Sequence, residues 1–578
     1  MYEYVHIVEG YRDAAGKVRH RVVANLGRRD RLKASGALDN LAGAFSRLDP
    51  APGRYLCGPL PLVVPILRRL DLVGIVDRAC PMRGHSALTH GEVVAGLVAN
   101  RLSAPRPLYD VTGWAAAYGA ADWCGTPAGL LNDDRLGRAL DALADRIEQV
   151  TGGLALAAIG AYGLDAARLH WDFTSVAFTG AYEAQGSDGP RIGFGHSSDR
   201  QAHRRQLKVA EAVTASGVPL YGRVVAGGRH EGAETGELLE RLRSFAAPRR
   251  LLLVADSALV SGANLAAADA AGIRLVSRLP RSFGYEERAL ALAPDRWRRL
   301  AYRSARAARL PPAARPTFVG CEDSLELRGP DGVSRRFRVL YVRGSEEAGA
   351  AAASRATLLE RATAALARIA RGLAVRPRQD REAVVRRVAR AVAAGAVGRY
   401  LRTELETSDG SLALRWWRDE AALADAARRD GLYALITNLG PHECSADRLL
   451  ALYKDQQLVE RAHHFLKGPL RVRPVFLHSN RRAAALVAVC SIALIVYGLV
   501  EAEVRRVIAP RRTIRGLLPE GRAARPTAPN IFGVFAGLGF QRARGRDGLV
   551  VIPDPITDAQ RQILDALGVS SILPPETT

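Results

Sequence analysis

The chain has 578 residues, which is too many for one hydrophobic core, so three or four domains are expected. Hydrophobic residues make up 48% and charged residues 24%, a balance that excludes a disordered or fibrous chain. The net charge of +23 and the isoelectric point near 10.4 indicate a polyanionic partner, and nucleic acid is the commonest polyanion.

Residues 2–26 alternate apolar and polar side chains around a DAAGK turn, which predicts a β-hairpin within an N-terminal region of residues 1–50. Residues 51–155 carry Leu-rich runs separated by Pro and Gly, and this pattern predicts a small helical DNA-binding domain. Asn132 is predicted to begin one of its helices. The first residues do not resemble a signal peptide, so a cytoplasmic, nucleoid-associated protein is expected.

From 156 to 280 the pattern changes to that of a sheet. The segments RLHWDFTSVAF (168–178), QLKVAEAVTAS (206–216) and PLYGRVVAGG (219–228) predict three strands of a meander. The apolar run RRLLLVADSAL predicts a buried central strand, and SGANLAAADAAG and RLVSRLP then predict a helix and another strand. The sequence therefore predicts a mixed α/β sheet flanked by helices.

Residues 281–430 are predicted to interrupt this sheet. They carry hairpin-like strands around Pro330-Asp331-Gly332 and a long Arg/Ala-rich helical region over 355–400. The sheet pattern resumes at GLYALITNL, at the start of a second core segment over 431–506. One helix is expected to begin near Ser445 and to include DRLLALYKDQQLVERAHHFLKG.

The last part of the core contains an uncharged run of 18 residues over 483–500. This run is just long enough to span a bilayer, but in so basic a chain a buried core helix is the favoured interpretation. The tail over 507–578 is rich in Arg, Pro and Gly and is predicted to hold a last helix near 557–567.

Three acids stand out by their placement. Asp172 lies inside a strand between Trp171 and Phe173, where a carboxylate is costly unless it is paired or bound to a metal ion. Asp256 ends the central strand, where α/β sheets place ligand groups, and Glu460 lies in a helix. These carboxylates could hold two hard cations for phosphoryl transfer. Alternatively, Asp256 caps the next helix and Glu460 is a solvated residue.

Tyr453, Glu460 and Lys467 are spaced seven residues apart, so on a single helix they would project from one face. Such a stripe suits a metal site beside a phosphate backbone, with Lys467 as a compact positive charge. A plain solvated face is the alternative. Three histidines could also touch DNA or metal, although structural or surface roles are favoured: His196, His463 and His464.

The spacing of Tyr453, Gln456, Glu460 and Lys467 resembles the Tyr-Arg-Glu-Lys signature of bacterial insertion-sequence DDE transposases. Gln456 is a departure, because the signature has Arg there. In that family the Arg would contact DNA backbone or hairpin-end phosphates, so the departure puts a hairpin route of cleavage in question.

Further blocks of the chain resemble the same family in the same order. WDFTSV around Asp172 and LLLVADSAL around Asp256 are similar to its two Asp blocks. GHSSDRQAHRRQLKV, AGGRHEGAET, DGLYALITN, LTHGEVVAGLVANRL and PRPLYDV are supporting matches. The resemblance covers roughly residues 1–505.

The resemblance implies an RNase H-like catalytic core with a β-rich insertion between the second Asp and the Glu. It implies that Asp172, Asp256 and Glu460 hold two divalent ions, Mg²⁺ with Mn²⁺ able to substitute. The partners would be double-stranded DNA, both terminal inverted repeats and target, bound by a homodimer on paired ends. Three residues would contact DNA: Tyr453, Gln456 and Lys467.

Other classes of function stay open at this point. One is a DNA-binding protein without activity that descends from a transposase, and another is an RNase H-like nuclease. A membrane protein is a third, and it would rest only on the apolar run over 483–500.

Overall fold

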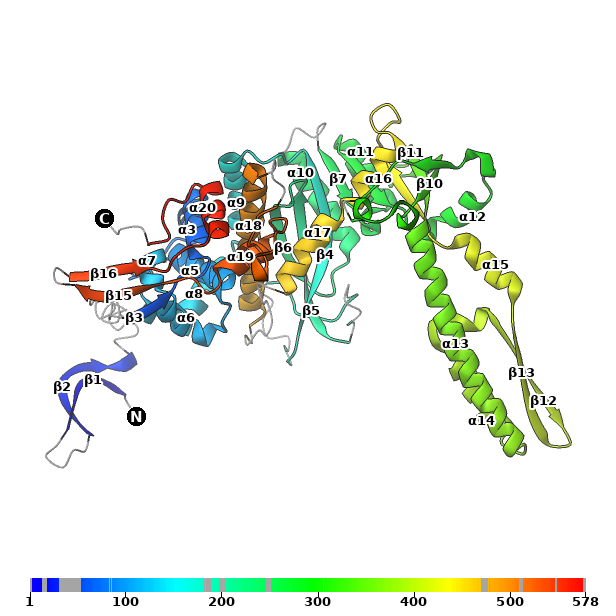
Figure 1. Cartoon of the computed structure of the whole chain (residues 1–578), viewed down its shortest axis with the longest axis horizontal. Helices are drawn as coiled ribbons and strands as arrows, with labels where there is room; N and C mark the ends of the chain where they lie inside the picture. Colours follow the sequence, from blue (N-terminus) through cyan, green and yellow to red (C-terminus); the bar gives the residue numbers. More distant parts are fainter. Residues whose placement is uncertain are drawn as a thin grey trace. The chain divides into compact units, whose positions relative to one another are not determined.

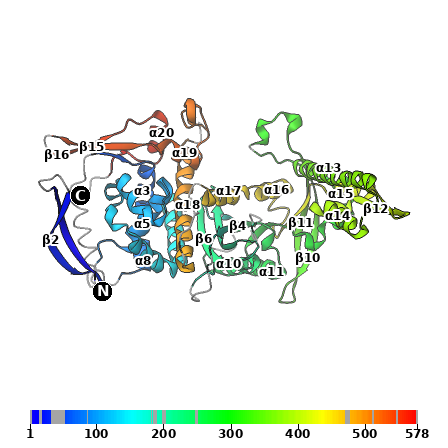
Figure 2. The same ribbon diagram turned by 90° about the horizontal axis from the view of Figure 1, so that it is seen from below.

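The chain is described from a computed structural model (Figures 1 and 2). The structure describes residues 3–12, 18–30, 53–82, 84, 86–180, 182, 189–196, 201, 203–245, 251–304, 306–468, 477, 479–508, 513–545 and 548–574. The predicted DAAGK turn lies outside these residues. The chain divides into two compact units: Met1–His230 with Gln457–Thr578, and Glu231–Gln456.

The first unit opens with two antiparallel strands, β1 (Tyr4–Arg12) and β2 (Val18–Arg28). Helices then follow in short succession: α3 (Leu60–Arg69), α4 (Leu72–Ala79), α5 (His90–Ser103), α6 (Val111–Ala117), α7 (Ala120–Cys124), α8 (Asp133–Ala144) and α9 (Ile147–Tyr162). The predicted helix start is confirmed, because the Asn132 side chain accepts a hydrogen bond from the Arg135 backbone N–H at 3.0 Å.

Three antiparallel strands follow: β4 (Arg168–Phe178), β5 (Arg205–Thr214) and β6 (Pro219–Ala226). Strand β5 lies between the other two, and adjacent strands pair with their neighbours in sequence. The predicted meander is confirmed.

Helix α18 (Asn480–Ile508) is largely buried in this unit, and 94% of its most apolar 18-residue window is buried. Figure 2 shows it beside β6, with α17 (Gln457–Lys467) near β4. Length and composition would let α18 cross a membrane. Its burial among α3, α5, α8 and β6 instead confirms the predicted core helix.

Glycine lets α18 approach the sheet closely. A Cβ atom on Gly222 of β6 would lie 3.0 Å from the Cβ of Ser491, and one on Gly498 would lie 2.9 Å from Cδ of Pro219. Larger residues at either position would push helix and strand apart.

The C-terminal residues are not the separate tail that the sequence predicts. Strand β15 (Gly539–Gly545) pairs with both β16 (Gly548–Pro553) and β3 (Gly53–Leu56). Helices α19 (Ala528–Phe535) and α20 (Asp558–Ala566) pack on α18. The last helix was predicted at the right place. The pairing of β15 with β3, which lie near opposite ends of the chain, was missed because short strands leave little pattern in the sequence.

The second unit holds a six-stranded mixed sheet in the order β7-β8-β14-β11-β10-β9. Its strands are β7 (Leu252–Ala255), β8 (Arg274–Arg278), β9 (Arg298–Leu300), β10 (Phe318–Arg328), β11 (Ser334–Gly344) and β14 (Leu432–Thr437). β7 and β8 are parallel, as their connection through α11 (Gly262–Ala270) requires. Helices α12 (Tyr285–Leu290) and α16 (Ala446–Lys454) also belong here. So does α10 (Glu231–Phe245), which the sequence analysis missed.

The predicted interruption over 281–430 is only partly separate from the sheet. The hairpin of β10 and β11 forms around Pro330-Asp331-Gly332 as predicted, yet β11 pairs with β14 and so extends the same sheet. The remaining elements form an arm, which extends away from β10 and β11 in Figure 1. They are α13 (Ser345–Val375), α14 (Arg381–Ala393), β12 (Leu401–Ser408), β13 (Ser411–Arg418) and α15 (Glu420–Arg429).

The arm has a hydrophobic core of its own, which includes Leu366, Val384 and Leu414. A bidentate ion pair between Arg355 and Asp430, with its closer contact at 2.6 Å, joins α13 to the end of α15.

The pairing of β15 with β3 can be tested at Phe540, which is 1% exposed and stacks on Tyr55 with ring centroids 5.6 Å apart. We expect Phe540→Ala to lower the free energy of unfolding by about 3–5 kcal/mol, because it removes a buried ring and leaves a cavity. Urea unfolding measures this. The control Val550→Ala, at a residue 48% exposed on β16, should change it by less than about 0.5 kcal/mol. Equal effects of the two substitutions would contradict the role given to this pairing.

Candidate active site

Asp172 lies in the middle of β4 and points to one face of the strand, while Trp171 and Phe173 share the other face. The two rings meet edge to face at 5.4 Å and are 2% and 6% exposed, which anchors the strand on both sides of the acid. The Asp172 side chain keeps 20% of its surface exposed, and its Oδ1 accepts the Phe173 backbone N–H at 2.8 Å. The carboxylate is therefore held by a rigid strand and remains open to solvent.

Glu211 of β5 is the direct cross-strand partner of Asp172. Residues opposite one another in an antiparallel pair project from the same face, so two carboxyl groups stand side by side. Glu211 is 1% exposed, and Ser491 of α18 lies beside its side chain. Burial raises the pKa of Glu211 to about 8, although the Ser491 hydroxyl, as a donor, opposes that rise. Near neutral pH a protonated Glu211 then adds no negative charge beside the Asp172 carboxyl group.

His463 of α17 lies between these two carboxyl groups. Its Nδ1 is 3.7 Å from Oδ2 of Asp172, and its Nε2 is 3.5 Å from Oε2 of Glu211. Burial and, to a smaller extent, the nearby charge of Lys467 lower the pKa of His463 to about 3. A neutral imidazole has one donor and one acceptor nitrogen, so it can donate toward Asp172 while it accepts from a protonated Glu211.

Glu460 precedes His463 by three residues on α17, so the two side chains are neighbours along the helix. Val459, Ala462 and Leu466 are buried with His463, whereas Glu460 is exposed. Among the described residues, Glu460 has no hydrogen bond or ion pair. The structure thus brings Asp172 and Glu460 into the same unit, on a strand and on the helix that packs against it.

The predicted stripe of Tyr453, Glu460 and Lys467 is wrong, because two helices replace the single helix that the spacing assumed. Helix α16 ends at Lys454 and α17 begins at Gln457. Between them the Gln456 backbone N–H bonds to the carbonyl of Tyr453 at 3.0 Å, which tightens the chain into a turn. No Gly or Pro lies at this break, so no residue pattern predicts that the helix ends here.

The three proposed DNA contacts therefore have different environments. Tyr453 packs against the hydrophobic core of the second unit, with its ring 6.2 Å from that of Tyr433. Gln456 is 7% exposed, and Lys467 is half-buried at the end of α17. Of the three, Lys467 alone shares a helix with Glu460.

Asp256 directly follows β7 in the second unit. It caps the short 3₁₀ turn Ser257–Leu259, with the Ala258 backbone N–H donating to its Oδ1 at 3.0 Å. Burial raises the pKa of Asp256, the Ala258 N–H opposes this, and the charge of Glu231 adds to it. The Ser277 hydroxyl donates to the Asp256 carbonyl at 2.5 Å and holds the strand end against β8. Asp256 therefore ends the strand and also caps the turn that follows, so both interpretations made from the sequence apply to it.

The side chains Asp172, Asp256 and Glu460 fit Mg²⁺ or Mn²⁺ in kind, since all three offer the hard oxygen donors that these ions prefer. Glu460 is exposed and makes no hydrogen bond or ion pair within the described residues, and the Asp172 side chain is 20% exposed, so such ions can reach both carboxyl groups. Within the described ranges, however, no three His, Cys, Asp or Glu side chains are clustered closely enough to share one ion.

Sequence reasoning missed Glu211 and Ser491. Glu211 could have been found, because an acid inside the apolar strand KVAEAVT is as unusual as Asp172 in its own strand. His463 was expected to be structural, and its burial beside two acids was not foreseen. His196 and His464 are both exposed, as expected for surface histidines.

The three acids lie in a part of the chain that matches a known family. Residues 171–496 match the model described as transposase DDE domain, a span that includes Asp172, Asp256 and Glu460. The chain belongs to the DDE transposase family. Residues 1–50 match the N-terminal domain of IS1634 family transposases, which makes this an insertion-sequence member, and residues 57–152 match a domain of unknown function, DUF4277. No curated protein matches the chain.

The raised pKa of Glu211 predicts how stability depends on pH. Between about pH 6.5 and 8, His463 is neutral in the folded chain, where its pKa is about 3, whereas in the unfolded chain, with its ordinary pKa of 6.5, it is half protonated at the start of this range and neutral at its end. This effect of His463 is common to the parent and to a Glu211 variant, so it cancels when the two are compared. Glu211 is protonated when folded and ionised when unfolded, since its pKa rises from 4.5 to about 8. The folded chain therefore holds the extra proton, and raising the pH destabilises it by about 1.4 kcal/mol per pH unit.

We expect Glu211→Gln to remove this loss. Urea unfolding of the parent and of Glu211→Gln at pH 6.5 and pH 8 would measure the difference. A parent that loses no stability relative to the variant over this range would show that Glu211 is ionised in the fold.

Proposed function

We propose that this transposase cuts DNA at the ends of its own element and joins the freed ends to target DNA, in a reaction that depends on divalent metal ions. Asp172, Asp256 and Glu460 would hold two ions, Mg²⁺ or, as a substitute, Mn²⁺. The observation that carries the proposal is Asp172: a carboxylate fixed in mid-strand, open to solvent, inside the span that matches the DDE domain.

Two bound divalent ions would supply Lewis acidity, which helps to deprotonate the nucleophile and stabilises the attacking and leaving oxygens of phosphoryl transfer. The chain itself contributes position and charge. Strand β4 fixes Asp172, the turn after β7 fixes Asp256, and α17 presents Glu460. Water is the nucleophile at the element end, and the freed 3′-hydroxyl is the nucleophile toward target DNA. No protein side chain needs to form a covalent intermediate.

The partner would be double-stranded DNA, as terminal inverted repeats and as target, bound by a homodimer on paired ends in the cytoplasm. The net charge of +23 supports an anionic partner. The Tyr-Arg-Glu-Lys subgroup is part of the proposal and rests on sequence spacing. The buried position of Gln456 gives no support to a backbone contact there.

A cleavage assay tests the proposal. Purified protein is incubated with DNA that spans both ends of its element, with Mg²⁺, beside Asp172→Asn, Asp256→Asn and Glu460→Gln. We expect nicking at the element ends with the parent, and at least a 10³-fold loss with each variant, roughly the scale of removing a single catalytic group.

Each other outcome has a definite meaning. Binding without cutting by all four proteins would favour a DNA-binding descendant without activity. Cutting away from the element ends would favour a nuclease. Undiminished cutting by Glu460→Gln would remove that residue from the metal site.

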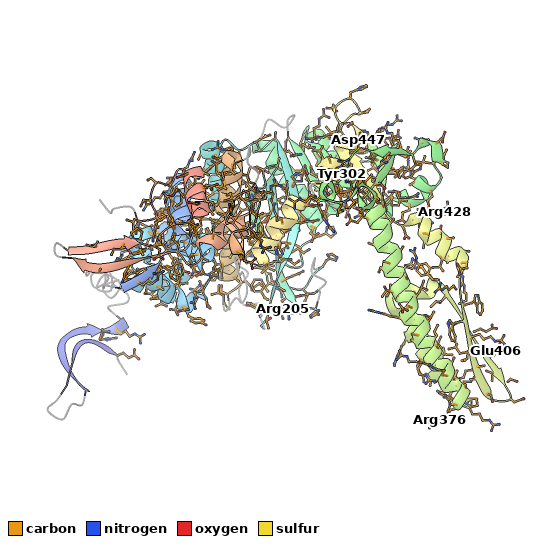
Figure 3. The ribbon with its side chains drawn as sticks, in the orientation of Figure 1. Arg205, Tyr302, Arg376, Glu406, Arg428 and Asp447 are labelled. Carbon is orange, nitrogen blue, oxygen red and sulfur yellow. The ribbon has the colours of Figure 1, made fainter. Side chains whose placement is uncertain are left out.

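The tip of the arm is a candidate surface for the DNA backbone. Seven exposed arginines lie between residues 371 and 390, against two acids, Asp380 and Glu382. Arg386 pairs with these acids and Arg387 bonds to Gln379. Figure 3 shows Arg376 at the far end of α13 from the sheet. Arg376, Arg378 and Arg381 make no ion pair within the described part of the chain, so their charge is available to phosphates.

We expect the triple substitution Arg376→Gln, Arg378→Gln and Arg381→Gln to weaken DNA binding and to reduce the salt slope of log Kd by up to about 3, roughly 0.9 per lost phosphate contact. The control removes the same charge from three exposed but ion-paired arginines: Arg336, Arg402 and Arg415. Binding titrations at several salt concentrations measure both. Equal slopes for the two triple variants would show that net charge alone, and not the arm tip, sets the affinity.

A further inference from the structure

We infer that His463 is a positioning residue that holds the Asp172 carboxylate in place for metal binding, and that Glu211 in turn holds His463. This inference rests on the proposed function, because it takes Asp172 as a metal ligand. It adds two residues that neither the family match nor the signature assigns.

The geometry places the imidazole as a bridge. Asp172 and Glu211 are paired across β4 and β5, and each faces a different nitrogen of the His463 ring, at 3.7 Å and 3.5 Å. The three groups come from three separate elements, so each fixes the others without any being a neighbour in sequence. Asp172 is the only one of the three that keeps appreciable exposure, 20% against 9% and 1% for the others.

Packing alone does not explain a histidine at this position. The buried face of α17 is otherwise apolar, with Val459, Ala462 and Leu466, and a hydrocarbon side chain would fill the same space. A buried imidazole needs polar partners, and the partners here are the two carboxyl groups. Glu211 likewise lies against Ser491 in an interior where an apolar residue would be less costly.

The present contacts are longer than hydrogen bonds, and Nε2 of His463 and both Glu211 oxygens lack a normal hydrogen bond in the described region. Catalytic hydrogen bonds are often long before the site is loaded and shorten afterwards. A small turn of the ring would bring Nδ1 within hydrogen-bond distance of Oδ2 of Asp172. Such a contact would restrict the rotamer of the Asp172 side chain.

The test is Mn²⁺ binding by the full-length protein without DNA, measured from the free Mn²⁺ signal in electron paramagnetic resonance. Two substitutions separate packing from positioning. His463→Phe keeps an aromatic ring but loses both nitrogens, whereas His463→Asn loses ring volume but keeps a donor near the place of Nδ1. Exposed His464, the next residue, provides the matched control His464→Phe.

We expect His463→Phe to weaken Mn²⁺ binding about 10-fold or more, in the range found for residues that orient metal ligands. His463→Asn should retain most of the affinity, and His464→Phe should match the parent. In an Asp172→Asn background, His463→Phe should cause no further loss, because its effect passes through Asp172. DNA binding in EDTA should be unchanged in every variant.

Parent-like Mn²⁺ binding by His463→Phe, or weaker binding by His463→Asn than by His463→Phe, would overturn the inference. If His463→Phe does not fold, Glu211→Met decides, since it leaves the imidazole in place but removes the hydrogen-bond donor to Nε2: it must weaken Mn²⁺ binding in the same direction, and parent-like binding overturns the inference. Asp172→Asn is the reference for the proposed function. If that variant binds Mn²⁺ like the parent, the metal role of Asp172 fails, which is a different result from failure of His463 alone.

Discussion

The close packing of α18 on β6 is the constraint on which the first unit depends. Gly222 and Gly498 allow helix and strand to approach so closely that a Cβ atom on either glycine would lie 3.0 Å or 2.9 Å from an atom of the other element. Around the same helix are packed the N-terminal helices α3, α5 and α8, the meander, α17 and the C-terminal helices α19 and α20. Residues from both ends of the chain thus share one core. The buried Glu501 joins α18 to α17 and α19: its carboxylate accepts the Ala528 backbone N–H at 2.7 Å and pairs with Arg461 and Arg505.

That packing also determines the electrostatics beside Asp172. Ser491 of α18 and His463 of α17 close over Glu211, and burial then favours the neutral forms of both the acid and the imidazole. Two ionised carboxylates directly opposite one another on a sheet would repel. With Glu211 protonated, the residue opposite Asp172 on β5 carries no negative charge that would repel an anionic neighbour. The packing of the two helices on the strands thus places the buried Glu211 and His463 beside the partly exposed Asp172.

Much of the fold could be predicted from sequence because the pattern was strong. The strands of the meander, the buried helix over 483–500 and the cap at Asn132 each have a local signal: β-branched content, an uncharged run, or a capping residue. The features that were not predicted lack such a local signal in the sequence. The break between α16 and α17 lacks Gly and Pro, and the pairing of β15 with β3 joins short strands far apart in sequence. Likewise, the contact of His463 with Glu211 exists only once β5, α17 and α18 are folded together.

The break after α16 changes what the family-like spacing means physically. Seven-residue intervals suggested one helix with a common face, yet Tyr453 and Gln456 lie at the end of the second unit, whereas Glu460 and Lys467 lie on α17 in the first unit. Tyr453 packs in the core beside Tyr433, and Lys454 lies over the Tyr433 ring while bonding to Glu347 at 2.6 Å. These contacts fix the end of α16. The turn that follows sets where α17 starts, and so determines which residues of α17 face the strands: His463 toward the sheet and Glu460 toward solvent. The spacing of Tyr453, Glu460 and Lys467 therefore does not describe a single helical stripe, because the turn after α16 separates Tyr453 from the helix that carries Glu460.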